Sequence, residues 1–223
     1  MIYSVALDGP GGAGKSTIAK KVASLKGILY VDTGAMYRAV ALYMLENGID
    51  INDEKSVCAA LENVQVDLAY QDGAQRVLLC GEDVSETIRQ SRVSMAASVT
   101  SAYKCVRAFL LDAQRDVAAR QSVVMDGRDI GTVVLPSAQV KIFLTADSRV
   151  RARRRYKELT EKGVQTDFDS VLADIEKRDW QDIHRRRSPL KQARDAVLVD
   201  TSEMDFDRAV RAVLAVIENK LGE

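Results

Sequence analysis

The most regular feature of the chain is a set of short apolar runs separated by longer segments with helical spacing. The runs are Ile2–Asp8, Ile28–Asp32, Ser122–Asp126, Gln139–Leu144 and Ala196–Asp200. Runs that are apolar throughout are typical of strands covered on both faces, as in a parallel sheet between helix layers. Four of the five end in Asp, which places carboxylates at the edge where open α/β sheets bind ligands. The pattern predicts an α/β fold with a five-stranded parallel sheet flanked by helices.

Two helices are predicted with definite ends. The first follows the first apolar run, from near Gly14 to Gly27, because glycine commonly terminates a helix. The second begins after Asp205, a residue suited to cap a helix start, and carries Phe206 and Val210 at helical spacing.

The stretch between Asp32 and Ser122 is too long for an ordinary crossover between parallel strands. Within it, residues 64–70 and 76–80 flank an Asp-Gly turn in the segment 71–75, a signature of an antiparallel hairpin. Helical patterns surround the hairpin at 35–46, 53–62 and roughly 85–120. This region is predicted to be a small α+β insertion.

Composition narrows the class of protein. The chain has 223 residues, 47% of them hydrophobic, and 32 Lys+Arg against 32 Asp+Glu. This balance disfavours disorder and gives no global field toward nucleic acid or membrane. No apolar run reaches membrane length, and the first run lacks the layout of a secretory signal. We therefore expect a cytosolic globular protein and, without an apolar heptad pattern, a monomer.

Cysteine and histidine are both scarce. Cys58, Cys80 and Cys105 are odd in number and widely spaced, which suggests three buried thiols in a reducing cytosol. A core of this size is expected to need neither a disulfide nor a zinc ion. The single histidine, His184, stands in a basic stretch and is expected to be solvated, which disfavours a His-dependent triad or a His-rich zinc site.

The segment after the first strand fits the phosphate-loop pattern G-x-x-x-x-G-K-[ST] completely. Its residues are Gly9, Pro10, Gly11, Gly12, Ala13, Gly14, Lys15, Ser16 and Thr17. Glycines let successive N–H groups curl around phosphate oxygens, and the helix start adds partial positive charge. Lys15 is placed to reach the β- and γ-phosphates of ATP, and the Ser16 hydroxyl to bind Mg²⁺.

Two other nucleotide-binding classes are less favoured. Gly9, Gly11 and Gly14, with Asp32 after the next strand, also fit a dinucleotide fingerprint, but that fold has no special use for the Lys15-Ser16 pair. A GTPase is disfavoured because the nearest approach to its base-reading motif, residues 219–222, lacks the required Asp.

The segment 149–194 is strongly basic, with 14 Lys+Arg against 8 Asp+Glu. A solvated helix face is the simpler explanation of such a run. A small kinase offers another, since arginines clamp phosphates with two parallel hydrogen bonds. A phosphate acceptor is already anionic and needs no general base, which agrees with the scarcity of histidine.

Several motifs, in order over nearly the full chain, resemble those of bacterial-type cytidylate kinases. They are 9–17, Asp-Thr-Gly-Ala-Met-Tyr-Arg at 32–38, Gly-Glu-Asp-Val-Ser at 81–85, Asp-Gly-Arg-Asp-Ile-Gly-Thr-Val-Val at 126–134, and Arg-Asp at 178–179 through Arg185. The resemblance implies one P-loop kinase domain. Its parts are a core (about 1–32, 121–150 and 190–223), a nucleoside-monophosphate-binding insertion (about 33–120) and a short lid region (about 151–189).

The resemblance also implies transfer of the γ-phosphoryl group of ATP to CMP or dCMP, with Mg²⁺. It assigns catalytic roles to Lys15, Arg128, Arg154 and Arg155, and acceptor binding to Thr33, Arg38, Ser98, Arg107, Arg128, Asp129, Arg178, Asp182 and Arg185. Among these, Ser98, Arg107 and Asp129 are similar to the residues that read cytosine. Arg178 and Asp182 would hold the ribose, and Arg128 and Arg185 the acceptor phosphate.

Two alternatives stay open on the residues. Another small kinase could phosphorylate a different monophosphate or an alcohol, and an alcohol would need a base such as Asp8, Asp32 or Asp129. A nucleotide-binding regulator could bind ATP without any acceptor.

Overall fold

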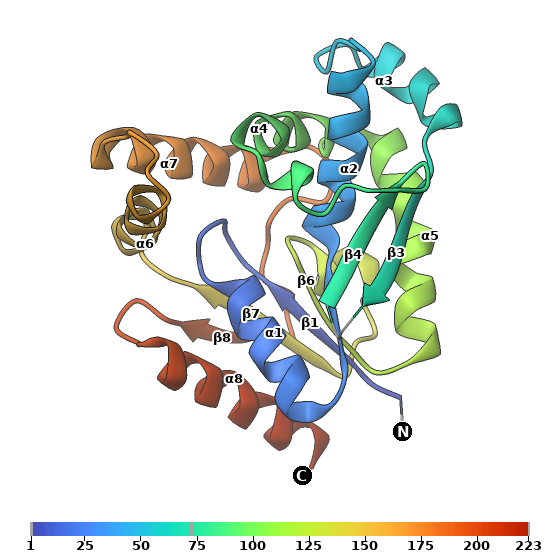
Figure 1. Cartoon of the computed structure of the whole chain (residues 1–223). Coiled ribbons are helices and arrows are strands. Elements are labelled where there is room, and N and C mark those ends of the chain that lie inside the picture. The colour runs from blue at the N-terminus through green and yellow to red at the C-terminus, as the bar shows by residue number, and fades with distance from the viewer. Residues whose placement is uncertain (1, 72–73, 223) are drawn as a thin grey trace. The chain divides into compact units, whose positions relative to one another are not determined.

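The computed structural model describes residues 2–71 and 74–222, which fold into two compact units (Figure 1). The core unit contains the chain up to Leu29 and again from Ser122 onward. The inserted unit runs from Tyr30 to Gln121.

A parallel sheet forms the centre of the fold, with the strand order β2-β6-β1-β7-β8. The strands are β1 (Ser4–Asp8), β2 (Leu29–Asp32), β6 (Val123–Gly127), β7 (Val140–Thr145) and β8 (Val197–Asp200). All five predicted apolar runs are thus confirmed as strands of one sheet. Because β1 pairs with β6 on one side and β7 on the other, the loops that follow these strands emerge at one sheet edge.

Two helices of the core unit, α1 (Lys15–Lys26) and α8 (Phe206–Leu221), pack against each other (Figure 1). The predicted ends of α1 are confirmed, with Gly14 and Gly27 in left-handed conformation as its caps. The Asp205 carboxylate accepts a hydrogen bond from Arg208 N, which confirms the predicted start of α8.

The predicted lid region, about 151–189, falls largely on two helices, α6 (Ser148–Glu161) and α7 (Phe168–His184). Ala152, Val171 and Ile175 form a small buried cluster between them. His184 is exposed, as expected, and its ring stacks on that of Trp180 with centroids 4.6 Å apart.

The inserted unit combines helices with a small antiparallel sheet. Its elements are α2 (Thr33–Glu46), α3 (Glu54–Ala60), η1 (Leu61–Asn63), β3 (Val66–Gln71), β4 (Ala74–Leu79), β5 (Glu82–Asp83), η2 (Thr87–Arg89), α4 (Ser91–Thr100) and α5 (Lys104–Arg120). The predicted hairpin is confirmed as β3 and β4, although its turn residues 72–73 lie outside the described residues. Strand β5, which extends this sheet, was not predicted.

The helical pattern predicted over roughly 85–120 is confirmed, and the structure divides the segment into η2, α4 and α5. The break between α4 and α5 is rich in hydroxyls, which compete for the backbone: Thr100 donates to Ala96 O and Ser101 to Ser98 O. Tyr103 then adopts an extended conformation, and its hydroxyl donates to the carbonyl of Ile51. The segment 53–62 likewise ends as the 3₁₀ turn η1 instead of continuing α3.

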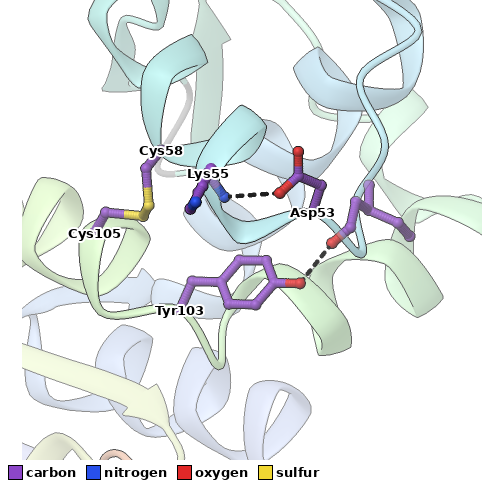
Figure 2. Close-up of a disulfide and its surroundings, with 6 residues drawn as sticks. Asp53, Lys55, Cys58, Tyr103 and Cys105 are labelled. Carbon is purple, nitrogen blue, oxygen red and sulfur yellow. Dashed lines mark hydrogen bonds between the residues drawn. A yellow bond between two sulfur atoms is a disulfide. The ribbon is translucent and has the colours of Figure 1, made fainter.

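A disulfide contradicts the expectation of three buried thiols. Cys58 in α3 and Cys105 in the first turn of α5 are joined, with their Cα atoms 5.7 Å apart (Figure 2). The third cysteine, Cys80, is exposed. The sequence could not reveal this pair, because 47 positions separate the two cysteines and only the folded inserted unit brings them together. The bond also removes the cysteine-based argument for a reducing compartment.

Within the described residues, no helix has both the length and the apolar character needed to cross a membrane.

Candidate active site

The phosphate loop joins β1 to α1 through a backbone that only glycine can adopt at its first position. Gly9 has φ 151°, and a Cβ added there would lie 1.9 Å from the carbonyl oxygen of Leu144 in β7. Gly12 and Gly14 also have positive φ. The loop therefore curls tightly before α1 begins, in the conformation that presents N–H groups to phosphate oxygens.

Lys15 lies inside this curl, where its side chain is buried and Nζ donates to the carbonyl of Pro10 at 2.8 Å. Burial, together with the positive charge of Arg128, lowers the pKa of Lys15 from 10.5 to about 7. Asp126, Asp182 and Asp8 oppose this shift. A polyphosphate bound in the loop would place negative charge beside Lys15 Nζ and so favour its protonated form.

The Ser16 hydroxyl donates to Asp126 Oδ2 at 2.6 Å. A hydroxyl and a carboxylate are hard oxygen ligands of the kind that Mg²⁺ prefers, so this pair fits the metal that the sequence motif implies. Asp126 was not predicted as a metal residue. The available signal was its place at the end of an apolar strand, beside the strand that leads into the phosphate loop.

Four predicted acceptor-binding side chains form one network in the core unit. Arg128 Nε donates to Asp182 Oδ2 at 2.9 Å, and Arg185 lies 3.7 Å from both Asp182 Oδ1 and Asp129 Oδ1. Burial favours a raised pKa for Asp182, but the charges of Arg128 and Arg185 outweigh it and hold that pKa below its ordinary value. Arg178 contributes charge in the same direction from the exposed surface of α7. The network therefore keeps Asp182 ionised beside two guanidinium groups.

The phosphate loop touches this network through Gly11, because a Cβ added at Gly11 would lie 3.6 Å from Arg128 Nη2. Lys15, Arg128 and Asp182 are thus brought together, as the sequence predicted for one site.

The arginines of α6 differ in what they contact. Arg154 Nη2 donates to the carbonyl of Thr201 at 2.7 Å, and Arg155 pairs with Glu158 at 2.8 Å on the surface. In this structure both predicted catalytic lid arginines are engaged outside the phosphate loop.

Arg151 instead reaches the phosphate loop, where Nη1 donates to Gly11 O at 2.9 Å. Its guanidinium also holds both carboxylate oxygens of Asp179 in α7, at 3.1 and 2.6 Å. The side chain is 5% exposed. Arg151 and Asp179 therefore tie α6, α7 and the loop together. The sequence assigned neither residue a role, because a contact between segments this far apart leaves no local signal.

The remaining predicted acceptor residues lie in the inserted unit. Thr33 is buried in the first turn of α2, and Arg38 pairs with Asp32 at 2.9 Å. The Asp32 carboxylate also accepts from Ala35 N and so caps α2. Gln75 in β4 accepts from Asp32 N at 2.8 Å, an unpredicted contact that fixes the start of this helix.

Ser98 and Arg107 lie on the last two helices of the inserted unit, α4 and α5. Arg107 Nη1 donates to Ser101 O at 3.1 Å, and its guanidinium carbon lies 5.3 Å from the centre of the Tyr37 ring. Ser98 donates to Ser94 O one turn earlier in α4. Arg107 is thus held between a carbonyl and an aromatic face.

The chain is similar to known proteins over nearly its whole length. The family model described as cytidylate kinase matches residues 5–219. The cytidylate kinase of Leuconostoc mesenteroides subsp. mesenteroides is 47% identical over 219 residues, which cover 98% of each chain. The cytidylate kinase of Pediococcus pentosaceus is 46% identical over 217 residues, which cover 97% of this chain and 96% of that protein.

Among solved structures, a gluconokinase from Sinorhizobium meliloti 1021 superposes with a TM-score of 0.51 at 16% identity. The match covers 98% of this chain and 93% of the gluconokinase. At this identity the likeness shows only the fold, which is the predicted P-loop kinase fold.

Proposed function

Because the chain belongs to the cytidylate kinase family, we propose that it transfers the γ-phosphoryl group of ATP to CMP or dCMP, giving ADP and CDP or dCDP. The observation that carries this proposal is the contact of the phosphate loop with the Arg128–Asp182–Arg185 network. Phosphate-binding groups for a donor and for an anionic acceptor thereby lie in one unit.

The donor triphosphate binds in the curl of the loop, with Lys15 on its β- and γ-phosphates. Ser16 and Asp126 would hold Mg²⁺, which neutralises phosphate charge. The protein's own contribution is to orient the two substrates and to stabilise charge, since the acceptor oxygen is already anionic.

Arg128 and Arg185 bind the acceptor phosphate, and Arg178 with Asp182 bind the ribose. Asp129 is the residue suited to accept a hydrogen bond from the exocyclic amine of cytosine, a group that uracil lacks. From the inserted unit, Ser98 and Arg107 bind the base, while Thr33 and Arg38 bind the acceptor nucleotide. Arg154 and Arg155 act on the transferring group by leaving their present partners when α6 and α7 close and exclude water.

A coupled ADP-release assay with Mg²⁺ and ATP against CMP, dCMP, UMP, AMP and GMP tests the proposal. Fast turnover with CMP and dCMP and much slower turnover with UMP is the expected result. A preference for AMP or GMP would keep the kinase and overturn the cytosine assignment. Turnover with no dependence on an acceptor would favour an ATP-binding regulator.

Arg128→Ala tests the acceptor site within the same assay. It is expected to raise the KM for CMP by about tenfold or more, the effect of losing a charge-assisted contact. Arg89→Ala is the matched control, because Arg89 is an exposed arginine of η2 that pairs only loosely with Glu86 at 3.6 Å. Equal kinetics for wild type and Arg128→Ala would remove Arg128 from the acceptor site.

We further propose that the protein is a monomer in the cytoplasm and binds neither nucleic acid nor membrane. Size-exclusion chromatography tests the oligomeric state.

A further inference from the structure

The strand β6 is followed by a π-helical turn, η3 (Ile130–Val134). Asp129 stands at its N-cap position, yet among the described residues its side chain makes no capping hydrogen bond. The first N–H groups of a helix have no partner within the helix and need one elsewhere. Aspartate is among the residues that most often supply that partner at this position. The capping of η3 is therefore unusual.

Asp8, the last residue of β1, caps the turn from another strand. Its Oδ1 accepts from Ile130 N and its Oδ2 from Gly131 N, both at 2.7 Å. The side chain is buried, and a Cβ added at Gly131 would lie 3.3 Å from Asp8 Oδ2. Asp8 also immediately precedes Gly9, the first residue of the phosphate loop. One carboxylate thus joins the end of β1 to the turn that begins after Asp129.

The Asp129 side chain, in turn, faces a partner outside its own turn. Its Oδ1 lies 3.7 Å from Arg185 Nη2, so the carboxylate is directed toward the arginine network and not back onto its own turn. Because Asp8 supplies both capping bonds, Asp129 can hold this orientation without leaving the amides of Ile130 and Gly131 unsatisfied.

We propose that Asp8 is a positioning residue for base selection: it caps the turn after β6 in place of Asp129, so that the Asp129 carboxylate is presented to the base of the acceptor nucleotide. The role rests on the proposed function, in which Asp129 accepts from the cytosine amine. Asp8 itself touches neither substrate, and both of its oxygens are already used by backbone N–H groups.

The substitution Asp8→Asn separates this role from simple packing, because it preserves size and shape. A carboxylate accepts with both oxygens, whereas a carboxamide accepts with one and presents an NH₂ group to the second N–H. The turn then lacks one capping acceptor, and the nearest replacement is Asp129, whose position favours capping. An Asp129 side chain that caps its own turn is no longer available to the base.

The test is a double-mutant cycle with wild type, Asp8→Asn, Asp129→Asn and the double variant, assayed with CMP and with UMP at saturating ATP and Mg²⁺. Asp8→Asn is expected to raise the KM for CMP by about tenfold, the size of one lost hydrogen bond to a charged group. Its kcat should change less than its KM, and its preference for CMP over UMP should fall. In the Asp129→Asn background, the same substitution should leave the KM for CMP within about twofold.

Two further readouts keep the test independent of a folding defect. Hydrogen exchange at the amides of Ile130 and Gly131 should be faster in Asp8→Asn. The affinity for a fluorescent ATP analogue should fall by less than the affinity for CMP, because Asp8 is the weakest of the charges that raise the Lys15 pKa. Gly131→Ala is the second variant: it retains the Asp8 charge but crowds its carboxylate, and should produce a smaller rise in the same KM. Asp53→Asn is the control, since the Asp53 carboxylate also caps a helix, accepting from Lys55 N at the start of α3.

Three results would overturn the role of Asp8 while leaving the proposed function intact. They are wild-type kinetics for Asp8→Asn, losses for Asp8→Asn and Asp129→Asn that simply add, and a loss of ATP affinity as large as the loss for CMP. A wild-type protein that does not phosphorylate CMP would instead overturn the proposed function and the role of Asp8 with it.

Discussion

The two units fix their candidate site residues by different means. In the core unit the side chains are held by ion pairs in buried surroundings, such as Arg151 with Asp179 and Arg128 with Asp182. In the inserted unit Arg38 also forms an ion pair, with Asp32. Arg107, by contrast, rests on a carbonyl and an aromatic ring, two residues after a cysteine that is covalently tied to α3.

The proposed function offers a reason for this difference. A site for phosphates needs several cations close together, and each of them is costly to bury unless a carboxylate faces it. A site that reads a base needs few charges but a firm scaffold, which an apolar core with residues such as Met36, Leu42 and Leu110 can provide. Substitutions in the core unit should therefore act by leaving charges unpaired, and those in the inserted unit by removing covalent or apolar contacts.

The largest effect is expected from Arg151→Met. It leaves the Asp179 carboxylate, whose side chain is 17% exposed, without its bidentate partner. Removing one member of such a buried pair lowers the free energy of unfolding by about 3–5 kcal/mol, which urea denaturation measures. Arg153→Met, on the exposed surface of α6, is the control. Replacing both Arg151 and Asp179 by Met should be less harmful than Arg151→Met alone, and an equal or greater loss would contradict the account.

Removal of the disulfide should have the next largest effect. The chain-entropy model gives a loss of about 4 kcal/mol for Cys58→Ser with Cys105→Ser, given a sequence separation of 47. The kcat at saturating CMP should stay unchanged, because neither sulfur belongs to the proposed site. Guanidinium unfolding with and without a reducing agent provides the measurement, with Cys80→Ser as the control. Identical midpoints for the wild type and the double variant would contradict a structural role.

Asp8 should affect stability and CMP turnover with opposite pH dependence. Burial raises its pKa from 3.8 to about 6; the Ile130 and Gly131 N–H groups and the Lys15 charge oppose this rise, and the Asp129 charge reinforces it. Lys141, whose side chain lies against Gly131, is paired with Asp195. The folded protein therefore holds this proton more tightly than the unfolded chain does.

Protonation of Asp8 therefore adds to the free energy of unfolding below about pH 4, and this contribution is lost as the pH rises to about 6. Measured against Asp8→Asn, which does not titrate, the contribution is about 3 kcal/mol. Acceptor binding should change in the opposite direction, because only the ionised carboxylate accepts from both amides. The ratio of kcat/KM for CMP between wild type and Asp8→Asn should therefore fall as the pH drops through 6. The ratio cancels the titration of the CMP phosphate itself, which lies in the same range. If the stability contribution of Asp8 and the kcat/KM ratio changed in the same direction with pH, the proposed role of the ionised carboxylate would be contradicted.

The smallest effect is expected at the surface of α6. Glu158 accepts from Arg155 and Lys162, but its side chain is 47% exposed. Glu158→Ala should change the free energy of unfolding by less than about 1 kcal/mol, and thermal melting measures it. A loss near that of Arg151→Met would remove the contrast between buried and exposed pairs.

Local features were predictable from the sequence where local physics determines them. The five strands were recognisable because parallel strands are apolar on both faces, and Gly14, Gly27 and Asp205 marked helix ends through their backbone preferences. The phosphate loop was recognisable because its curl requires glycine, as the closeness of Leu144 O to Gly9 shows.

Contacts between distant segments were not predictable in the same way. Asp8 and Gly131, Arg151 and Gly11, and Cys58 and Cys105 meet only after the chain has folded, and nothing in their spacing marks them as partners. The break between α4 and α5 was missed for a related reason, since helical spacing continues across it while Tyr103 is drawn to the Ile51 carbonyl.

Phosphoryl transfer between ATP and a cytidine monophosphate can be followed on the phosphoryl group itself. The wild-type protein would be incubated with Mg²⁺, CMP and ATP labelled in its γ-phosphate, and the products separated. The label is expected in CDP, with little in inorganic phosphate. Label released as inorganic phosphate, or retained in ATP in the presence of CMP, would contradict it.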